Sequence, residues 1–448
     1  MKAYTLATAR TACGFDVRQA FATHEETIRR LLILVALYAI PAVMVMGPVL
    51  DPDIWSHLRT GQWIIEHGAV PQTDPFSNYG MGRPWIAYSW LFQVMVYGLY
   101  TWLGLTGILL YRIVFSLAVV AVVHYFVAKR EPRFIVAICL VALATIPILP
   151  SLNERSWLFT ILAFTLTLDI VLNLRQGIAT KVVWLLPPLY ALWANVHIQF
   201  VYGLFILALA CAAPLGDRLL GRDQPGDHAG TVGSRCWWML VALTGACFAA
   251  TLLNPYHMRL YAVVVEYATQ TVPYRYIQEH TAPSFRSFPD WVALAVAGAG
   301  VFALARRPKA SIFEVLLLTA AAYFSFRTRR DVWVLVIVAV ALVTIRRPLA
   351  VIADRFTLTK WRELLVVGTV LAVMAVAGHI RGISENHMES AVAENYPAAA
   401  AAVVEERGYP GPLYNHYNWG GYLIWRLPNL PVTIDGRTDV HGDEHIKR

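Results

Sequence analysis

Residues 31–59 read LLILVALYAIPAVMVMGPVLDPDIWSHLR, an apolar run that ends abruptly in carboxylates, a histidine and an arginine. A helix needs about 20 apolar residues to cross roughly 30 Å of hydrocarbon. Because residues 31–50 meet that length, they predict a membrane-spanning helix that delivers a polar loop to one membrane surface.

The composition of the whole chain indicates that it crosses the membrane many times. Of its 448 residues, 57% are hydrophobic and 15% are charged, which is more apolar surface than a soluble fold could bury. The net charge of +8 comes from short basic clusters between apolar runs, which membrane topology explains better than nucleic-acid binding. Residues 1–30 lack a cleavage site and predict a cytoplasmic tail before an uncleaved anchor. The cysteines lack metal-like spacing, so we expect neither a disulfide nor a zinc site.

Twelve apolar segments are candidates for crossing the membrane. They are residues 31–50, 85–104, 105–128, 134–150, 157–174, 182–197, 199–217, 237–253, 290–305, 310–326, 331–346 and 363–380. If all of them crossed, the basic residues 129–133 would fall outside, against the tendency of basic loops to stay in the cytoplasm. We therefore expect the aromatic segment 85–104 to lie in the outer interface, which leaves eleven crossings.

This topology predicts an all-α polytopic membrane protein with about 11 to 12 transmembrane helices. The transmembrane domain would span residues 31–380, with a first outer loop at 51–104. The last segment, 381–448, changes character: an Ala-rich helix from Pro397 to Glu406 precedes strand-like runs at 413–415 and 431–434. It predicts a small extracytoplasmic α/β cap, and we expect part of that cap to lie beyond the end of this sequence.

The first outer loop carries the strongest candidate for chemistry. Its apolar residues share one face of a helix that would lie on the bilayer and end at Gly68. Asp53 could simply cap the start of that helix. A carboxylate at the mouth of the first span is, however, also placed to deprotonate an acceptor hydroxyl, and Asp51 would raise its basicity by like charge.

A second candidate is a cluster of arginines on the predicted outer side, at Arg327, Arg329 and Arg330. Basic residues are disfavoured on the outer side, so the presence of three arginines there calls for a functional or structural explanation. A guanidinium binds phosphate oxygens in a bidentate fork, and we expect these side chains to clamp a lipid phosphate. The structural alternative is that they only snorkel to the headgroups.

Further polar groups converge on the same side of the membrane. Each of them alone is more often a satisfied interfacial residue, but together they favour a binding site. The segments in question are Trp193-Ala-Asn195-Val-His197, Asn254-Pro255-Tyr256, Gln278-Glu279-His280, Asn418-Trp419-Gly-Gly-Tyr422 and Asp435-Gly436-Arg437.

Together with the first loop, these segments resemble the GT-C superfamily of membrane glycosyltransferases, in particular bacterial members that use polyprenyl-phosphate sugars. In the first loop the resemblance rests on Asp51-Pro-Asp53-Ile-Trp55, His57, Thr73-Asp74-Pro75 and Pro84-Trp85. The chain departs from the family pattern where Pro52 interrupts the acidic pair and where Ser156 follows Arg155 in place of a proline.

The resemblance implies an inverting glycosyltransferase of the bacterial inner membrane, with a cytoplasmic N-terminus and an extracytoplasmic C-terminus. A sugar would pass from a polyprenyl-phosphate carrier to a glycan, lipid or protein acceptor, with Asp53 as general base and Asp51 as its neighbour or substitute. No cofactor is certain, although two carboxylates could hold Mg²⁺ or Mn²⁺. The expected substrate-binding residues are His57, Arg59, Asp74, Trp85, Asn195, His197, Asn254, Glu279, His280, Arg327, Arg329, Arg330, Asn418, Trp419, Asp435 and Arg437.

Two other classes of protein would fit the same spans. A flippase or transporter of lipid-linked sugars tends to place polar sites near the midplane and to show internal repeats. Here Arg112 and Asp169 are the clearest ionisable residues expected within spans, whereas the outer loops are dense in polar groups, which favours an enzyme. A non-catalytic subunit of a polysaccharide assembly system would have no need of Asp53.

Overall fold

The computed structural model describes residues 17–178, 181–219, 233–307, 310–345 and 358–446, with side chains from residue 24 onward. The structure is 76% helical, and the described ranges contain no β-strand. Seven of the described helices are long and apolar enough to cross a membrane. The chain is therefore an all-α membrane protein. Residues 1–16, most of the predicted cytoplasmic tail, lie outside the described ranges.

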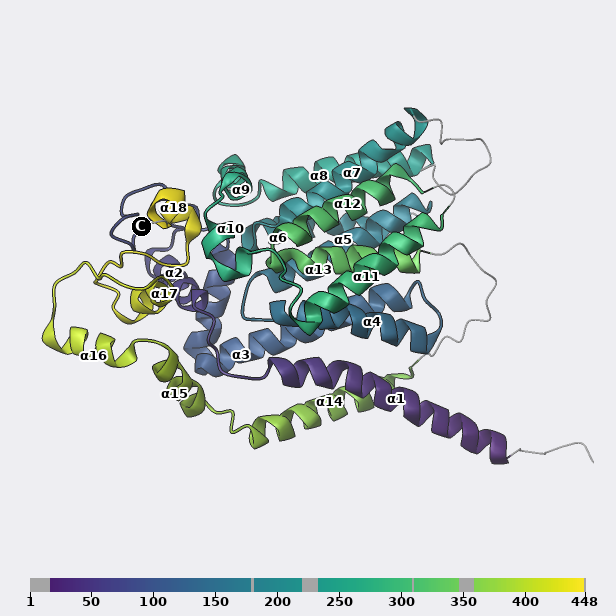
Figure 1. Cartoon of the computed structure of the whole chain (residues 1–448), viewed down its shortest axis with the longest axis horizontal. Coiled ribbons are helices and arrows are strands. Elements are labelled where there is room, and N and C mark those ends of the chain that lie inside the picture. Colours follow the sequence, from purple (N-terminus) through teal and green to yellow (C-terminus); the bar gives the residue numbers. More distant parts are fainter. Residues whose placement is uncertain (1–16, 179–180, 220–232, 308–309, 346–357, 447–448) are drawn as a thin grey trace, which may run out of the picture.

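A bundle of long helices forms the body of the molecule (Figure 1). Its members are α1 (Val17–Val45), the second part of α3 (Trp90–Ala128), α4 (Phe134–Ile148), α5 (Trp157–Arg175), α6 (Leu186–Val196), α7 (Phe200–Leu219), α8 (Ser234–Thr251), α11 (Phe288–Ala305), α12 (Ile312–Arg327), α13 (Val332–Thr344) and α14 (Lys360–Ile380). Each predicted apolar segment corresponds to one of these helices or to one part of α3. The predicted count of 11 to 12 crossings is not established, because α6, α8, α12 and α13 are not among the seven.

The centre of the bundle is α13. Its sequence is apolar on every side, and each residue from Val332 to Leu342 is buried. A helix that is hydrophobic all round belongs inside a large assembly of helices. Trp333 of α13 packs edge-to-face against Phe164 of α5, with the ring centroids 5.1 Å apart.

A sharp break divides α3 at Gly104, where φ is 61° and ψ is −147°. The part before the break lies across the end of the bundle, whereas the part after it runs along the bundle (Figure 1). The second part of α3 starts at this break, and its first backbone N–H groups have no acceptor within the helix. Glu385 supplies one, accepting from the amides of Leu105 at 2.6 Å and Thr106 at 2.9 Å. The aromatic segment 85–104 thus turns away from the bundle direction, as predicted, while its depth in a bilayer stays a prediction.

Short helices gather at the end of the bundle where α3 breaks (Figure 1). They are α2 (Asp53–His67), α9 (Leu260–Thr269), α10 (Pro273–Tyr276), α15 (Glu385–Asn395), α16 (Ala398–Arg407), α17 (Tyr417–Arg426) and α18 (Thr438–Ile446). The predicted Ala-rich helix appears as α16. The predicted α/β cap is not confirmed: within the described part of residues 381–448, the two strand-like runs make only an isolated bridge between Leu413 and Val432.

The two ionisable residues expected in the middle of spans are paired near the ends of the bundle. Asp169, near the C-terminal end of α5, binds Lys129 at 2.8 Å and Arg130 at 2.6 Å. Arg112 binds Glu154 at 2.9 Å and also donates to the carbonyls of Gly47 and Pro48. Both side chains therefore have structural partners, and neither marks a polar site at mid-depth.

Candidate active site

The site is built around Asp53, the first residue of α2. The expectation that Asp53 caps this helix is wrong, because Pro52 occupies the cap position and no side chain caps it. The backbone amide of Asp53 donates instead to Asp51 Oδ1 at 2.9 Å. Gly68 ends α2 as predicted, with φ 61° and its amide bonded to the carbonyl of Ile64. The Asp53 carboxylate is therefore not used in capping and faces the rest of the site.

Arg155, in the loop between α4 and α5, binds three carboxylates at once. It donates to Asp53 Oδ2, its Nε lies 2.5 Å from Asp51 Oδ2, and its Nη2 lies 3.6 Å from Glu279. One buried cation is thus shared by carboxylates from two segments that lie far apart in the sequence. Such an arrangement fixes the position of Asp53 through charge-assisted bonds, which are shorter and stronger than neutral ones.

The residues beside Arg155 hold the start of the first outer loop. Asn153 donates to Asp51 Oδ2 at 3.1 Å, and Glu154 accepts from the Asp51 amide at 3.2 Å. Glu154 is in turn held by Arg112. Sequence reasoning missed this segment as part of the site. The available signal was three polar residues in succession, Asn153 to Arg155, between two apolar runs.

Burial and like charge make the paired carboxylates more basic than usual. Burial raises the pKa of Asp51 to about 7, Arg155 acts in the opposite direction, and the nearby Asp53 and Glu154 raise it further. The pKa of Asp53 is also raised by burial, against the pull of Arg155. A carboxylate with a raised pKa is a stronger base at neutral pH, which suits proton abstraction from a hydroxyl.

Three hollows meet at these residues. A narrow cavity of about 50 Å³ is lined by Asp53, His57, Trp85, His197, Glu279, His280, Arg330 and Arg437 among others. An outer cavity of about 690 Å³ shares Asp53, Arg155, Glu279 and Tyr417 with it. A lateral groove of about 300 Å³ between α7, α9 and α12 shares Tyr88, Tyr267, His280 and Arg330. The narrow cavity therefore shares its walls with the outer cavity, which several charged residues line, and with a largely apolar groove.

The three arginines predicted to clamp a lipid phosphate have different surroundings in the structure. Arg329 pairs with Asp290 at 3.3 Å and lines the outer cavity. Arg327 lies over the ring of Tyr274 and donates to the carbonyl of Ala268. Only Arg330 lines both the narrow cavity and the lateral groove, with its guanidinium 4.5 Å from the centre of the Trp157 ring. Of the three, Arg330 is best placed to meet a phosphate that enters from the groove.

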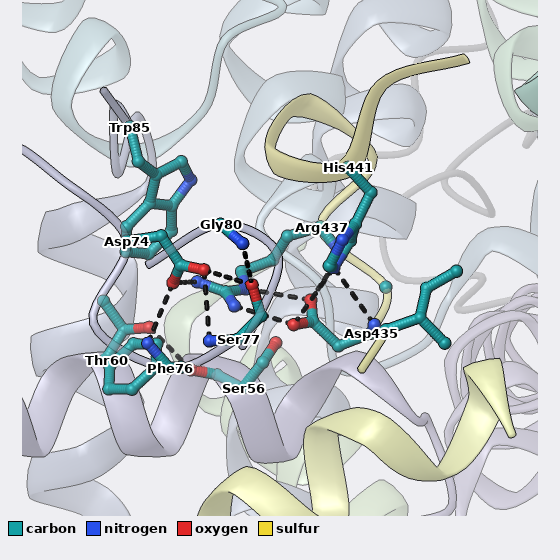
Figure 2. Close-up of polar contacts among 12 residues, drawn as sticks. Ser56, Thr60, Asp74, Phe76, Ser77, Gly80, Trp85, Asp435, Arg437 and His441 are labelled. Atoms are coloured by element: carbon teal, nitrogen blue, oxygen red, sulfur yellow. Dashed lines mark hydrogen bonds and ion pairs between the residues drawn. The ribbon is translucent and has the colours of Figure 1, made fainter. Parts of the chain in front are cut away.

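The C-terminal residues form one wall of the narrow cavity. Gly436 lies so close to Asp53 that a Cβ at this position would collide with the carboxylate. Arg437 holds this wall in place, as Figure 2 shows: it binds Asp74 at 2.6 Å and Asp435 at 2.7 Å. His441 lies 3.3 Å from the same Asp435 carboxylate. Residues far apart in the sequence thus close the site together.

The structure brings two thirds of the predicted site residues to these hollows. They are Asp51, Asp53, His57, Trp85, His197, Glu279, His280, Arg327, Arg329, Arg330, Asn418 and Arg437. The others lie elsewhere, namely Arg59, Asp74, Asn195, Asn254, Trp419 and Asp435.

Those other residues have structural partners, and even the half-exposed Trp419 packs against the ring of His416. Asn195 accepts from Trp90 Nε1 at 2.7 Å and donates to the carbonyl of Leu253, which ties three segments together. Asn254 folds back on its own turn, where it accepts from the amide of Tyr256 at 2.7 Å. Arg59 binds Gln62 along α2. Their polar atoms support the walls of the site and do not line it.

Several lining residues carried no signal in the sequence. Tyr88 and Tyr267 bond to each other through their hydroxyls at 3.1 Å, although they lie in different outer segments. Ser89, Gln93, Trp157, Tyr417 and Asp439 also line the narrow cavity. Aromatic and small polar residues at span ends are common, so only the three-dimensional arrangement distinguishes these.

A metal site is not formed by the residues described. Within the described ranges no group of three or more His, Cys, Asp or Glu side chains converges as metal ligands do. The carboxylates of Asp51, Asp53 and Glu279 instead share the Arg155 guanidinium. The expectation of Mg²⁺ or Mn²⁺ therefore has no ligand set here.

Asp439 gives the site a testable pH dependence. Burial, with Glu266 nearby, raises the pKa of Asp439 to about 7, although Trp85 Nε1 donates to it at 3.0 Å. The folded protein therefore keeps a proton that the unfolded chain releases from about pH 4, and the free energy of unfolding falls as pH rises toward 7. Asp439→Asn should raise the melting temperature more at pH 8 than at pH 5. Thermal unfolding at both values tests this, with the exposed Glu405→Gln as control; parallel pH profiles for Asp439→Asn and the parent would contradict it.

No model of a known protein family matches the chain, and no curated protein matches its sequence.

Proposed function

We propose that this protein is an inverting glycosyltransferase that moves a sugar from a polyprenyl-phosphate carrier to an envelope acceptor. One observation carries the proposal: Asp53, a half-buried carboxylate with a raised pKa, lines both the outer cavity and the narrow cavity, and the narrow cavity shares further residues with the largely apolar lateral groove. A soluble acceptor group and a lipid-linked donor need these two entrances. The resemblance to the GT-C superfamily supports the same reaction.

The lipid donor would enter through the lateral groove. Apolar side chains such as Val201, Phe205 and Val264 line it and suit a prenyl chain. Arg330 stands at its inner end, where the carrier phosphate would arrive. A guanidinium there would bind the phosphate before the reaction and stabilise its added charge as the sugar leaves.

The acceptor would reach Asp53 from the outer cavity. Asp53 takes the proton of the acceptor hydroxyl while the hydroxyl oxygen bonds to the anomeric carbon. The bond between that carbon and the phosphate oxygen breaks, and its electron pair leaves with polyprenyl phosphate. A single displacement of this kind inverts the anomeric centre. Arg155 acts as a positioning residue, because it fixes the carboxylate without touching the reacting atoms in this scheme.

The proposed topology has eleven crossings. The bundle helices other than the first part of α3 would span the membrane, so that α2 and α15 to α18 lie at its outer face. In the bacterial inner membrane this places the N-terminus in the cytoplasm and the C-terminus outside. A Mg²⁺ or Mn²⁺ ion is not part of the proposal.

A flippase for lipid-linked sugars is the alternative that one observation favours. The lateral groove with Arg330 would serve lipid transport as well as transfer. The two functions differ at Asp53, which only an enzyme requires as a base. A purely structural subunit would require neither the groove nor the carboxylate.

The donor site can be tested by comparing two neighbouring arginines. Arg330→Gln should raise the KM for the lipid donor about tenfold or more, because a hydrogen bond to a charged group contributes roughly 1.5–3 kcal/mol. Arg329→Gln, a change of the same chemistry at the residue paired with Asp290, should leave that KM nearly unchanged. Initial rates of transfer at varied donor and acceptor concentrations provide the measurement. Equal effects on donor and acceptor, or no effect of Arg330→Gln, would count against the assignment.

A further inference from the structure

Four buried polar atoms without a hydrogen-bond partner belong to residues that line the narrow cavity. They are Ser89 Oγ, Gln93 Oε1, His197 Nε2 and Arg330 Nε, and none of them has a partner among the described residues. Native proteins seldom leave buried polar atoms unpaired, and each exception calls for an explanation. Their concentration at one cavity suggests that a polar ligand completes them.

A chain of hydrogen bonds fixes which nitrogen of His197 carries its proton. The indole of Trp193, which can only donate, binds Thr160 Oγ1 at 2.8 Å. Thr160 can then give its own hydrogen to His197 Nδ1, also at 2.8 Å. With Nδ1 as acceptor, the proton of the neutral ring resides on Nε2. The unpartnered atom is thus a hydrogen-bond donor.

The same reasoning identifies the protonated nitrogen of His57, which contacts Gln93. The amide nitrogen of Gln93 donates to His57 Nδ1 at 3.3 Å, so His57 also carries its proton on Nε2. The Gln93 oxygen remains as an unpartnered acceptor. Ser89 adds a hydroxyl that can donate or accept. The lining therefore offers donors and acceptors together, which is the mixture that sugar hydroxyl groups require.

This part of the lining is also uncharged. Burial and the neighbouring arginines lower the pKa of His57 to about 3, and His197 is almost completely buried. Ser89 and Gln93 are neutral at every pH. A carboxylate on the ligand would meet no ammonium or guanidinium among these four side chains, and burying an unpaired charge is costly.

Two of the arginines that line the cavity already form ion pairs within the protein. Arg155 pairs with Asp51, Asp53 and Glu279, and Arg437 pairs with Asp74 and Asp435. Arg330 faces the lateral groove as well as the cavity. A ligand whose phosphate lies at Arg330 would place its next group toward Ser89, Gln93 and the two histidines.

We infer that Ser89, Gln93, His57 and His197 form a subsite for the sugar of the lipid donor, and that this sugar is uncharged and bears hydroxyl groups. The inference rests on the proposed function and adds the class of sugar to it. A cavity of about 50 Å³ has room for a few water-sized groups, so hydroxyls at one edge of the ring would enter it. An uronic acid or an amino sugar would be the poorer donor.

Binding of three synthetic lipids to the purified full chain in nanodiscs tests the subsite. The lipids are undecaprenyl phosphate, undecaprenyl-phosphate glucose and undecaprenyl-phosphate glucuronic acid. Ser89→Ala and Gln93→Leu should each weaken binding of the glucose lipid about 3- to 10-fold, the usual loss for one hydrogen bond. Binding of undecaprenyl phosphate should not change. Gln62→Leu, on α2 and outside the cavity, is the matched control.

The outcomes separate this inference from the proposed function. If the parent protein binds the glucose lipid and the glucuronic acid lipid equally well, or if both variants bind the glucose lipid like the parent, the subsite is overturned while sugar transfer stands. If the parent binds none of the three lipids, the proposed function and the subsite fall together.

Discussion

Asp53→Asn is expected to lower the rate of sugar transfer by about 10² to 10⁴, which is the usual loss when a general base is removed. The protein should remain folded, because asparagine has nearly the same shape and Arg155 keeps Asp51 and Glu279 as partners. Binding of the lipid donor should also survive, since the expected donor contacts lie at Arg330 and beyond. Transfer assays on purified, monodisperse protein provide the measurement.

Asp51→Asn is the matched control for that experiment. Asp51 binds Arg155 and accepts from the Asp53 amide, so its loss should disturb the position of Asp53 without removing the base. A loss of roughly tenfold in rate would fit a positioning role. If Asp53→Asn stayed within a few-fold of the parent and Asp51→Asn did not, the base would be Asp51.

Arg437→Leu is expected to destabilise the outer part of the protein by about 3–5 kcal/mol, the usual result of removing one partner from a buried ion pair. Both of its partners, Asp74 and Asp435, are almost completely buried. Burial alone would raise the pKa of Asp435, but Arg437 and His441 hold it well below its ordinary value. The stabilisation is therefore present at neutral pH and lost only in strong acid.

A surface arginine provides the comparison for Arg437. Arg426 pairs with Glu405 at 2.7 Å, but 43% and 53% of their side chains are exposed. An exposed pair contributes at most about 1 kcal/mol, so Arg426→Leu should leave thermal unfolding almost unchanged. Equal melting temperatures for the two variants would show that the network in Figure 2 does not hold the C-terminal wall in place.

The helices of this fold could be predicted from the sequence because their signal is local. An apolar run of sufficient length must satisfy its own backbone, and in a membrane a helix does so within one segment. All twelve apolar segments are accordingly helical. The strand-like runs at 413–415 and 431–434 do meet, but they pair only at the isolated bridge between Leu413 and Val432, and the length of such a pairing depends on packing that short-range sequence does not reveal.

The site could be predicted only where a residue type is unusual for its position. Asp53 and Arg330 were found because carboxylates and arginines at span ends need a reason. Arg155 was missed because its importance comes from contacts with Asp51 and Asp53, about a hundred residues earlier in the chain. Asn195 was over-interpreted, since an amide at a helix end often satisfies backbone groups, as this one does.

A radiolabelled sugar on undecaprenyl phosphate distinguishes transfer to an acceptor from transport, when purified protein in liposomes is mixed with a cell-envelope extract. For a transferase we expect label on an extract component in step with released undecaprenyl phosphate, and at least about a hundredfold less release by Asp53→Asn protein. Label that crosses the liposome membrane while still attached to its carrier would instead identify the protein as a flippase and rule out the proposed transfer.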